Sequence, residues 1–189
     1  MATYEELLKI RRSVRDYTDQ DVPLELIKTL ITESTFAPNG SNEQPWQFII
    51  VRDKAYMKRI SDESKKNILE KIKSDPQSPI ARYETMLRME SFNVFYNAPC
   101  LVIIAGPKEK NNIRADCALA ASYFMLGAAA RGLGTCWINL GSYILNTEMR
   151  AKLGLSDDIE VVAPIILGYP KSIPSPPKRK PPQIVAVIE

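Results

Sequence analysis

The chain has 189 residues, of which 45% are hydrophobic, enough to bury the core of one domain near the upper edge of the common single-domain size. Its 25 Lys and Arg against 22 Asp and Glu give a formal net charge of +3, too mild to indicate a nucleic-acid or membrane partner. There is no His, which excludes Ser-His and Cys-His nucleophilic pairs and with them most hydrolases.

The cysteines Cys100, Cys117 and Cys136 are odd in number, widely spaced and set among apolar residues. They support neither a disulfide framework nor a zinc site, and they predict buried thiols in a reducing cytosol. The acidic start lacks the apolar core of a signal peptide, and the apolar stretch 117–130 is too short to span a bilayer. We therefore expect a cytoplasmic protein that binds neither a metal nor a membrane.

The first fifty residues are predicted to hold two helices, a loop and a strand. The capping-box pattern Thr3-Tyr4-Glu5-Glu6 begins a short helix, and Pro23 opens a second helix at its first position. Two prolines, a glycine and small polar residues exclude regular structure from residues 37–46, which are predicted to form a polar loop. Residues 47–51 are β-rich and mostly apolar, as for a strand covered on both faces.

The middle of the chain is predicted to be helical around one buried strand. Residues 53–73 are charged and helix-prone, and helical patterning resumes over residues 80–95 after two prolines. Residues 100–105 form an apolar run typical of a buried strand. Residues 113–131 are predicted to form one long helix, apolar nearly all round, which lies at the centre of one subunit or between two.

The last third is predicted to add two strands and a short helix. One strand is expected over residues 135–140, and a helix at about residues 146–153. A further strand is expected over residues 160–168, where Pro164 favours an edge or a bulge.

Residues 170–189 are predicted to form a C-terminal arm on a single domain that spans residues 1–189. Its proline-rich, basic part, residues 170–182, is extended and non-helical. Its apolar end, residues 184–188, is expected to join a sheet edge as a strand, because a lone strand is unstable in water. That edge can belong to a second chain.

Residues 11–15, RRSVR, hold the densest positive charge beside a hydroxyl in the chain. In an extended segment Arg11, Ser13 and Arg15 share one face, and in a helix Arg11 and Arg15 still fall together. Planar guanidinium forks suit the bidentate binding of phosphate oxygens. The pattern therefore indicates a phosphate site, and the alternative is a solvated basic turn.

Neither a phosphate loop of the form G-x-x-x-x-G-K-[ST] nor a G-x-G-x-x-G after a strand is present, which argues against NTP hydrolysis and a Rossmann dinucleotide site. Four stretches instead resemble, in this order, the FMN-dependent nitroreductase family: residues 11–15, 37–46, 48–51 and 132–137. The match runs from about Tyr4 to the basic C-terminal segment.

This resemblance implies an α+β, nitroreductase-like fold with a mixed, largely antiparallel sheet flanked by helices. It also implies a homodimer that exchanges its C-terminal strands and binds FMN at the subunit interface. The implied activity is ping-pong: NADH or NADPH reduces the flavin and leaves, and an electron-poor acceptor such as a nitroaromatic or a quinone then takes the electrons. Flavin N5 carries the chemistry, so no side chain is expected to be catalytic.

The resemblance also assigns cofactor-binding residues. Arg11 and Ser13 match phosphate contacts, Arg15 matches the basic side chain beside the flavin pyrimidine edge, and Arg12 is expected to make backbone or peripheral contacts. The loop that reaches the flavin from the other subunit is matched by Pro38, Asn39, Gly40, Ser41 and Asn42. The segment along the flavin ring is matched by Thr135, Cys136 and Trp137, and the final basic phosphate pair by Lys178 and Arg179.

Two departures from the family pattern limit this transfer. Asn139 and Leu140 stand where many members carry an acidic residue and then Gly, and the basic run 178–180 can be aligned in two registers. A second hypothesis is a non-catalytic protein whose basic, proline-rich tail docks an acidic partner. It leaves the loop at residues 37–46 unexplained, and the colour of a flavoprotein separates the two hypotheses.

Overall fold

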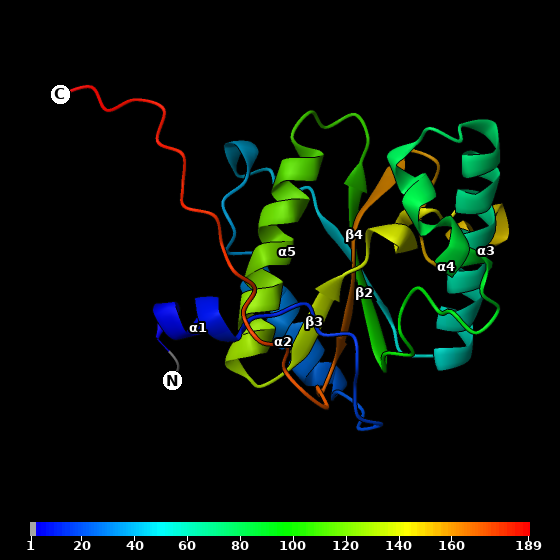
Figure 1. The fold of residues 1–189 in the computed structure, drawn as a ribbon, viewed down its shortest axis with the longest axis horizontal. Coiled ribbons are helices and arrows are strands. Elements are labelled where there is room, and N and C mark those ends of the chain that lie inside the picture. Colours follow the sequence, from blue (N-terminus) through cyan, green and yellow to red (C-terminus); the bar gives the residue numbers. More distant parts are fainter. Residues whose placement is uncertain (1–2) are drawn as a thin grey trace.

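The computed structural model describes residues 3–189, which form a four-stranded sheet covered by helices on both faces (Figure 1). The strands are β1 (Gln47–Val51), β2 (Cys100–Pro107), β3 (Gly134–Trp137) and β4 (Ile159–Gly168), in the order β1-β2-β4-β3. Every ladder between them is antiparallel. The parallel part of the mixed sheet is a single bridge between Ser13 and Thr135.

Helices α2 (Leu24–Ser34) and α5 (Ile113–Ala130) cover one face of the sheet. The other face carries α3 (Lys54–Ser74), α4 (Glu84–Arg88) and α6 (Thr147–Lys152). Side chains alternate along the inner strands, so Val102 of β2 packs toward α5 and Ile103 packs toward α3. The sheet thus separates two apolar cores, as the α+β prediction requires.

Four short helices complete the chain. Helix α1 (Tyr4–Ile10) begins at Thr3 with the predicted capping box, and Pro23 is the N-cap of α2. Single 3₁₀ turns, η1 (Gly40–Asn42), η2 (Pro79–Tyr83) and η3 (Asn139–Ser142), interrupt the long connections. None of the helices within residues 3–189 combines the length and hydropathy needed to cross a membrane.

One of these strand predictions needs correction. The segment 47–51 packs against both cores as predicted, with Ile49 and Val51 on one face and Phe48 and Ile50 on the other, although β1 is the outermost strand and its central residues are half-buried. The third strand was expected to reach residue 140 but ends at Trp137. The N–H of Ile138 donates to the Pro164 carbonyl at 2.7 Å, and Pro164 has no N–H to return, so the ladder stops and η3 begins.

Pro164 itself lies in β4, which pairs with β2 along nearly its whole length but with β3 only over residues 165–168. Pro164 therefore stands where the second side of the strand becomes an unpaired edge. In a strand the N and O of one residue point to the same side. Because the Pro164 carbonyl faces Ile138, its missing donor falls beyond the end of β3, where no partner is required. The β2–β4 register also shifts beside Pro164, between Ile104 and Ala105, so the predicted irregularity is confirmed.

The helix predicted over residues 80–95 is also too long, because it consists of η2 and α4 and ends at Arg88. Side chains of α3 bind the backbone that follows. The Lys65 ammonium donates to the carbonyls of Met89 and Phe92 at 2.8 and 2.9 Å, and the Val94 N–H donates to the Ser61 hydroxyl at 3.0 Å. These bonds satisfy groups that a continued helix would have paired internally.

Candidate functional site

Residues 11–15 are extended, which decides between the two geometries left open by the sequence. Arg12 and Val14 are 7% and 2% exposed, whereas Ser13 and Arg15 are exposed and Arg11 is half-buried. The N–H of Val14 donates to the Thr135 carbonyl at 3.0 Å and fixes the segment along the outer side of β3. The two phosphate-matching side chains and Arg15 therefore share one outward face, as the extended geometry predicts.

Close backbone contact holds this segment against β3. A Cβ at Gly134 would lie 2.8 Å from the Val14 side chain, so a larger residue there would displace residues 11–15. The Arg12 guanidinium turns inward, and its Nη1 donates to the carbonyls of Leu8 and Arg11 at 3.3 and 2.6 Å. Its Nε is buried without a hydrogen-bond partner among residues 3–189.

All three cysteines are buried and free, as the sequence predicted. Burial raises the pKa of Cys100 and Cys117 to about 12. Burial also raises the pKa of Cys136. The charges of Arg15 and Arg11 and a hydrogen bond with Ser13 act in the opposite direction, but burial is the largest effect. A raised pKa keeps the thiol protonated and unreactive at neutral pH. Cys136 is therefore part of the core beneath the basic segment.

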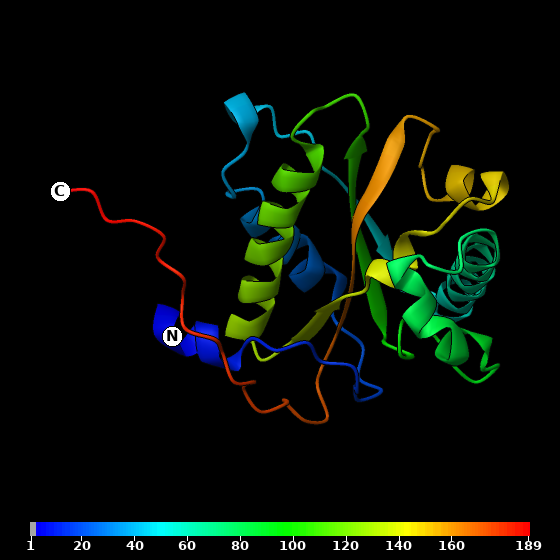
Figure 2. The ribbon, with the colours of Figure 1, turned by 45° about the horizontal axis from the view of Figure 1, so that its top comes forward.

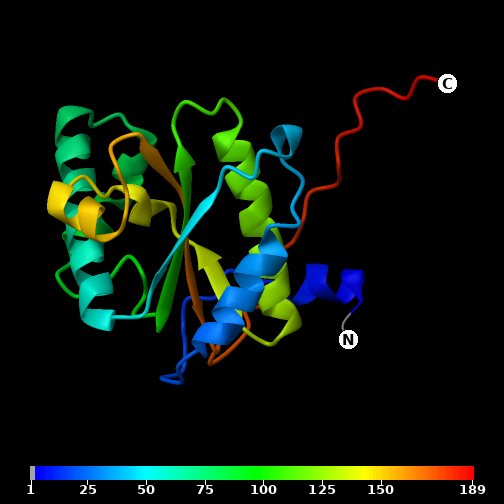
Figure 3. The ribbon, with the colours of Figure 1, turned by 180° about the vertical axis from the view of Figure 1, so that it is seen from behind.

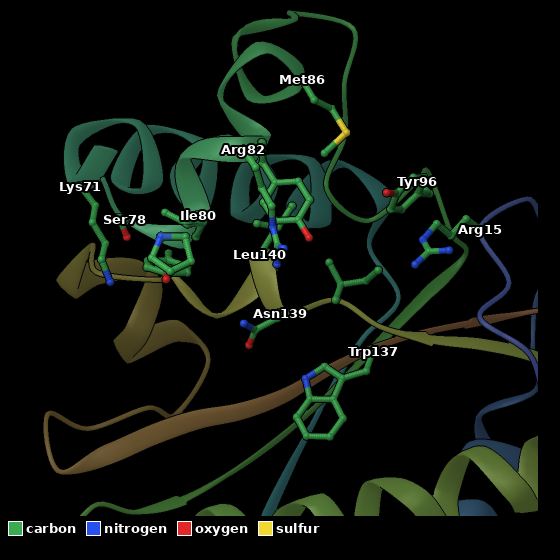
Figure 4. Close-up of a pocket in the computed structure, with 14 residues that line it drawn as sticks. Arg15, Lys71, Ser78, Ile80, Arg82, Met86, Tyr96, Trp137, Asn139 and Leu140 are labelled. Atoms are coloured by element: carbon green, nitrogen blue, oxygen red, sulfur yellow. The ribbon is translucent and has the colours of Figure 1, made fainter. Parts of the chain in front are cut away.

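A cavity of about 510 Å³ opens beside Arg15 (Figure 4). Two of the residues predicted for the site, Arg15 and Trp137, line it. The rest of its wall comes from the end of α3, the η2–α4 segment, the turn before β2 and the η3 region, and includes Lys71, Arg82, Tyr83, Tyr96, Asn139 and Tyr143. Sequence reasoning did not assign these residues to the site, because the segment at residues 71–96 carries no recognisable motif and Asn139 departs from the family pattern.

A turn of unusual backbone conformation brings Tyr96 to the cavity. Tyr96 and Asn97 have φ values of +52° and +53°, in the left-handed region that side chains other than Gly seldom adopt. The Asn93 amide donates to the Asn97 side-chain oxygen at 2.9 Å across this turn. The Arg15 guanidinium carbon lies 5.6 Å from the centroid of the Tyr96 ring. Such strain is common where a side chain is held for function.

The loop predicted to reach the flavin lies elsewhere, at the N-terminal end of α5. Asn39 stabilises the loop through its side-chain oxygen, which accepts from the Gln44 N–H at 2.8 Å, and the Gly40 N–H donates to the Asp116 carboxylate at 3.1 Å. Ser41 and Asn42 are exposed and have φ values of +50° and +56°. They follow the exposed Pro38, and Ser41 borders a hollow with Asn112 and Asp116 at the start of α5.

Helix α5 separates the two predicted halves of the site. Arg11 and Arg12 line a small hollow together with Ala129 and Gly134 at the C-terminal end of the helix, whereas the loop is bound to Asp116 near its N-terminal end. A helix rises about 1.5 Å per residue, so Asp116 and Ala129 lie roughly 20 Å apart along its axis. Figure 3 shows η1 beside one end of α5 and α1 beside the other.

The C-terminal arm begins beside the basic segment and then leaves the body of the chain (Figure 2). Tyr17 and Pro170 form an antiparallel bridge, and Ile173 borders the hollow beside Arg11. Lys178 and Arg179 are exposed, and the structure does not bring them to Arg11. The end of the arm forms no strand within this chain, and its apolar side chains are 73–97% exposed at Ile184, Val185, Val187 and Ile188.

Apolar side chains are also exposed on two helices next to the arm. Helix α1 buries none of its residues, and Tyr4 and Leu8 are 69% and 50% exposed. The long helix α5, expected at the centre of one subunit or between two, leaves Leu119 and Tyr123 40% and 42% exposed in the single chain. Residues four apart lie on one face of a helix, so each of these two pairs forms an uncovered apolar stripe along its own helix.

Comparison with known proteins places this arrangement in a family. The family model for the nitroreductase family matches residues 8–169. A protein of Archaeoglobus fulgidus with the provisional name NADH dehydrogenase/NAD(P)H nitroreductase is 31% identical over 177 residues, which cover 88% of this chain and 87% of that protein. The iodotyrosine deiodinase of Thermotoga neapolitana is 27% identical over 195 residues, which cover 97% of this chain and 95% of the deiodinase.

Solved structures agree with this placement. The crystal structure of a nitroreductase with bound FMN from Bacteroides fragilis superposes with a TM-score of 0.84 at 25% identity, and the match covers 99% of this chain and all of that one. A model of the whole family therefore matches most of the chain, and the fold agrees from end to end. The chain belongs to the nitroreductase family.

Proposed function

We propose that this chain is an FMN-dependent oxidoreductase that uses NADH or NADPH to reduce electron-poor acceptors such as nitroaromatics or quinones. The observation that carries the proposal is the outward face of residues 11–15, which presents Arg11, Ser13 and Arg15, the last of which lines a cavity of about 510 Å³. This donor set fits a flavin mononucleotide, which needs one phosphate site and one ring pocket.

In this proposal Arg11 and Ser13 bind the phosphate, and Lys178 and Arg179 of the arm complete its shell. Arg15 lies at the pyrimidine edge of the flavin, where its fixed charge stabilises negative charge. FMN, when bound, supplies hydride acceptance and electron delivery at N5. The chain therefore needs no side chain as acid or base for the hydride step, in keeping with its lack of His.

The main chain of β3 supplies donors along the ring. The Thr135 carbonyl faces away from β4, because it accepts from the Val14 N–H. Backbone groups alternate in direction along a strand, so Cys136 pairs with β4 and the N–H of Trp137 points outward again, on the cavity side. This amide is positioned to donate to a flavin ring lying in the cavity, and it is the role we assign to the Thr135–Trp137 segment.

We further place the flavin between two subunits of a homodimer. Residues 1–189 then act as one domain, and the arm at residues 170–189 exchanges with the partner. Two halves of one binding site roughly 20 Å apart along α5 cannot close on a single flavin within one chain. A second copy supplies the missing loop with Ser41 and Asn42, and it covers the exposed stripes of α1 and α5.

The purified protein is expected to be yellow and to release FMN on heating, because its donor set serves one phosphate and no adenosine-binding motif is present. Chromatography of the released flavin checks this. Recovery of FAD, or no flavin after reconstitution, contradicts the cofactor assignment.

Steady-state kinetics test the ping-pong mechanism. A single pocket used in turn by the nucleotide and the acceptor requires parallel lines in double-reciprocal plots of rate against nucleotide at several acceptor concentrations. Intersecting lines would show a ternary complex instead.

Arg15→Ala is expected to lower the midpoint potential of the bound flavin while the protein still retains FMN. The substitution removes a cation beside the atoms that gain negative charge on reduction. Arg59→Ala is the matched control, because Arg59 also lies over a tyrosine, at 5.5 Å from the Tyr56 centroid, but outside the cavity. A redox titration in which both variants keep the wild-type potential would show that Arg15 is not at the pyrimidine edge.

A further inference from the structure

The wall of the cavity beside Arg15 carries basic side chains and no acidic ones. Lys71, Arg82 and Arg15 line it, and none of its lining residues is Asp or Glu. Within residues 3–189 none of these three cations forms an ion pair, whereas seven other basic side chains do. The chain as a whole is nearly balanced in charge, so this wall is a local concentration of uncompensated positive charge.

Each of these cations lies instead against a tyrosine ring that also lines the cavity. The Lys71 ammonium is 5.4 Å from the centroid of Tyr143, and the Arg82 guanidinium carbon is 5.0 Å from that of Tyr83. A cation–π contact holds a side chain in place at low cost and leaves its charge available to an anion. The same rings offer flat apolar surface to a planar molecule.

The three cations do not have the same task. Arg15 belongs to the flavin edge in the proposed function, which leaves Lys71 and Arg82 without a partner. They come from the last turn of α3 and from η2, both on the far wall from β3 (Figure 4). A molecule that fills the cavity between Arg15 and this wall would meet these two side chains.

We infer that Lys71 and Arg82 recognise an acidic substituent on the electron acceptor, so that the acceptor class is an electron-poor aromatic bearing a carboxylate, sulfonate or phosphonate. This inference rests on the proposed function. The lining offers no carboxylate to an ammonium group. The cavity therefore selects an anion and disfavours a cation or a zwitterion of the same shape.

Three acceptors with the same nitrobenzene ring test the charge selection: 4-nitrobenzoate, 4-nitrobenzyl alcohol and 4-nitrobenzylamine. Replacing both cations, Lys71→Met with Arg82→Met, is expected to lower kcat/KM for the anion about tenfold. For the neutral alcohol the change should stay within about twofold, since neither charge touches it. Intrinsic reactivities differ among the probes, so the ratio of anion to alcohol is compared between variant and wild type.

Two further variants separate charge recognition from structural damage. Lys73→Met removes an exposed cation from the same last turn of α3 that does not line the cavity, and it should leave the ratio unchanged. Lys71→Arg keeps the charge and should preserve the preference. The variants are also assayed with saturating acceptor and varied NADH or NADPH. An effect confined to the KM of the nucleotide would mean that the cations bind its phosphates, which overturns the inference.

Binding to the oxidised protein, without reductant, gives a readout independent of turnover. Calorimetric titration with 4-nitrobenzoate should show affinity that falls in the double variant and at high salt, whereas 4-nitrobenzyl alcohol should respond to neither. If reductase activity is intact but the anion-to-alcohol ratio is the same in wild type and double variant, the anion site is wrong and the proposed function stands. If the anion binds as expected but no acceptor is reduced, the anion site stands and the proposed function is wrong.

Discussion

Deletion of residues 183–189 is expected to dissociate the dimer and to release FMN at the same time. The deleted segment carries Ile184, Val185, Val187 and Ile188, whose 73–97% exposure in the single chain leaves them suited to pairing with another chain. Each fully buried aliphatic side chain of this kind contributes about 1.5–3 kcal/mol, so their joint loss is large for an interface. Sedimentation followed at the flavin and protein absorbances measures both effects in one experiment.

A full-length variant with serine at those four positions separates side-chain burial from chain length, and it should behave like the deletion. Gln183→Ala with Glu189→Ala alters the ends of the segment but keeps its apolar core, and it should remain dimeric and yellow. A compact monomer that is saturated with FMN after the deletion would show that neither the arm nor the interface is needed for the flavin site.

Arg11→Ala is expected to raise the dissociation constant for FMN about 10- to 150-fold. The guanidinium makes charge-assisted hydrogen bonds to phosphate in the proposed site, and the loss of such a group costs about 1.5–3 kcal/mol. Fluorescence titration of the apoprotein with FMN provides the measurement. Turnover at saturating FMN should change little, since Arg11 is assigned to the phosphate and not to the reacting ring.

Lys9→Ala is the control for Arg11→Ala, because Lys9 is an exposed cation in the last turn of α1, close in sequence and outside the proposed phosphate shell. It should change FMN affinity only through long-range charge, an effect that disappears at high salt. Arg11→Lys should fall between the wild type and Arg11→Ala, since an ammonium cannot bind bidentately. Equal affinities for Arg11→Ala and Lys9→Ala would show that the phosphate lies elsewhere.

The predictions that depended on local chemistry were confirmed. The capping box at Thr3 follows from contacts between near neighbours in sequence, and the strand over residues 100–105 and the long helix from Ile113 were predicted from the residue pattern of their own segments. The alternation of buried and outward-facing side chains over residues 11–15 could also be predicted, because it follows from the two-residue period of an extended chain.

The errors arose where distant residues decide the outcome. Residues 80–95 carry a helical pattern, yet the helix ends at Arg88 because Lys65 and Ser61 of another helix bind the backbone beyond it. The third strand ends at Trp137 because Pro164, far along the chain, cannot pair. The cavity wall was missed for the same reason: its tyrosines come from the end of η2, from the residue after η3 and from a strained turn, and no sequence motif marks these places.

The site shared between two chains is the central structural claim, and subunit complementation tests it most directly. One chain carries Arg11→Ala with Arg15→Ala, the other carries Ser41→Glu with Asn42→Glu, and the two bear different affinity tags. Each homodimer should be folded and dimeric but low in flavin, because all of its sites contain one altered half. A loop variant that keeps its flavin would already contradict a role for Ser41 and Asn42.

Flavin content of the purified heterodimer is the deciding measurement. If the basic segment of one subunit joins the loop of the other, both sets of substitutions fall in one site and the second site is fully wild type. The heterodimer should then bind half as much FMN as the wild-type dimer, with restored reduction of an acceptor. If both halves belonged to the same chain, each site of the heterodimer would remain defective, and mixing would restore no flavin at all.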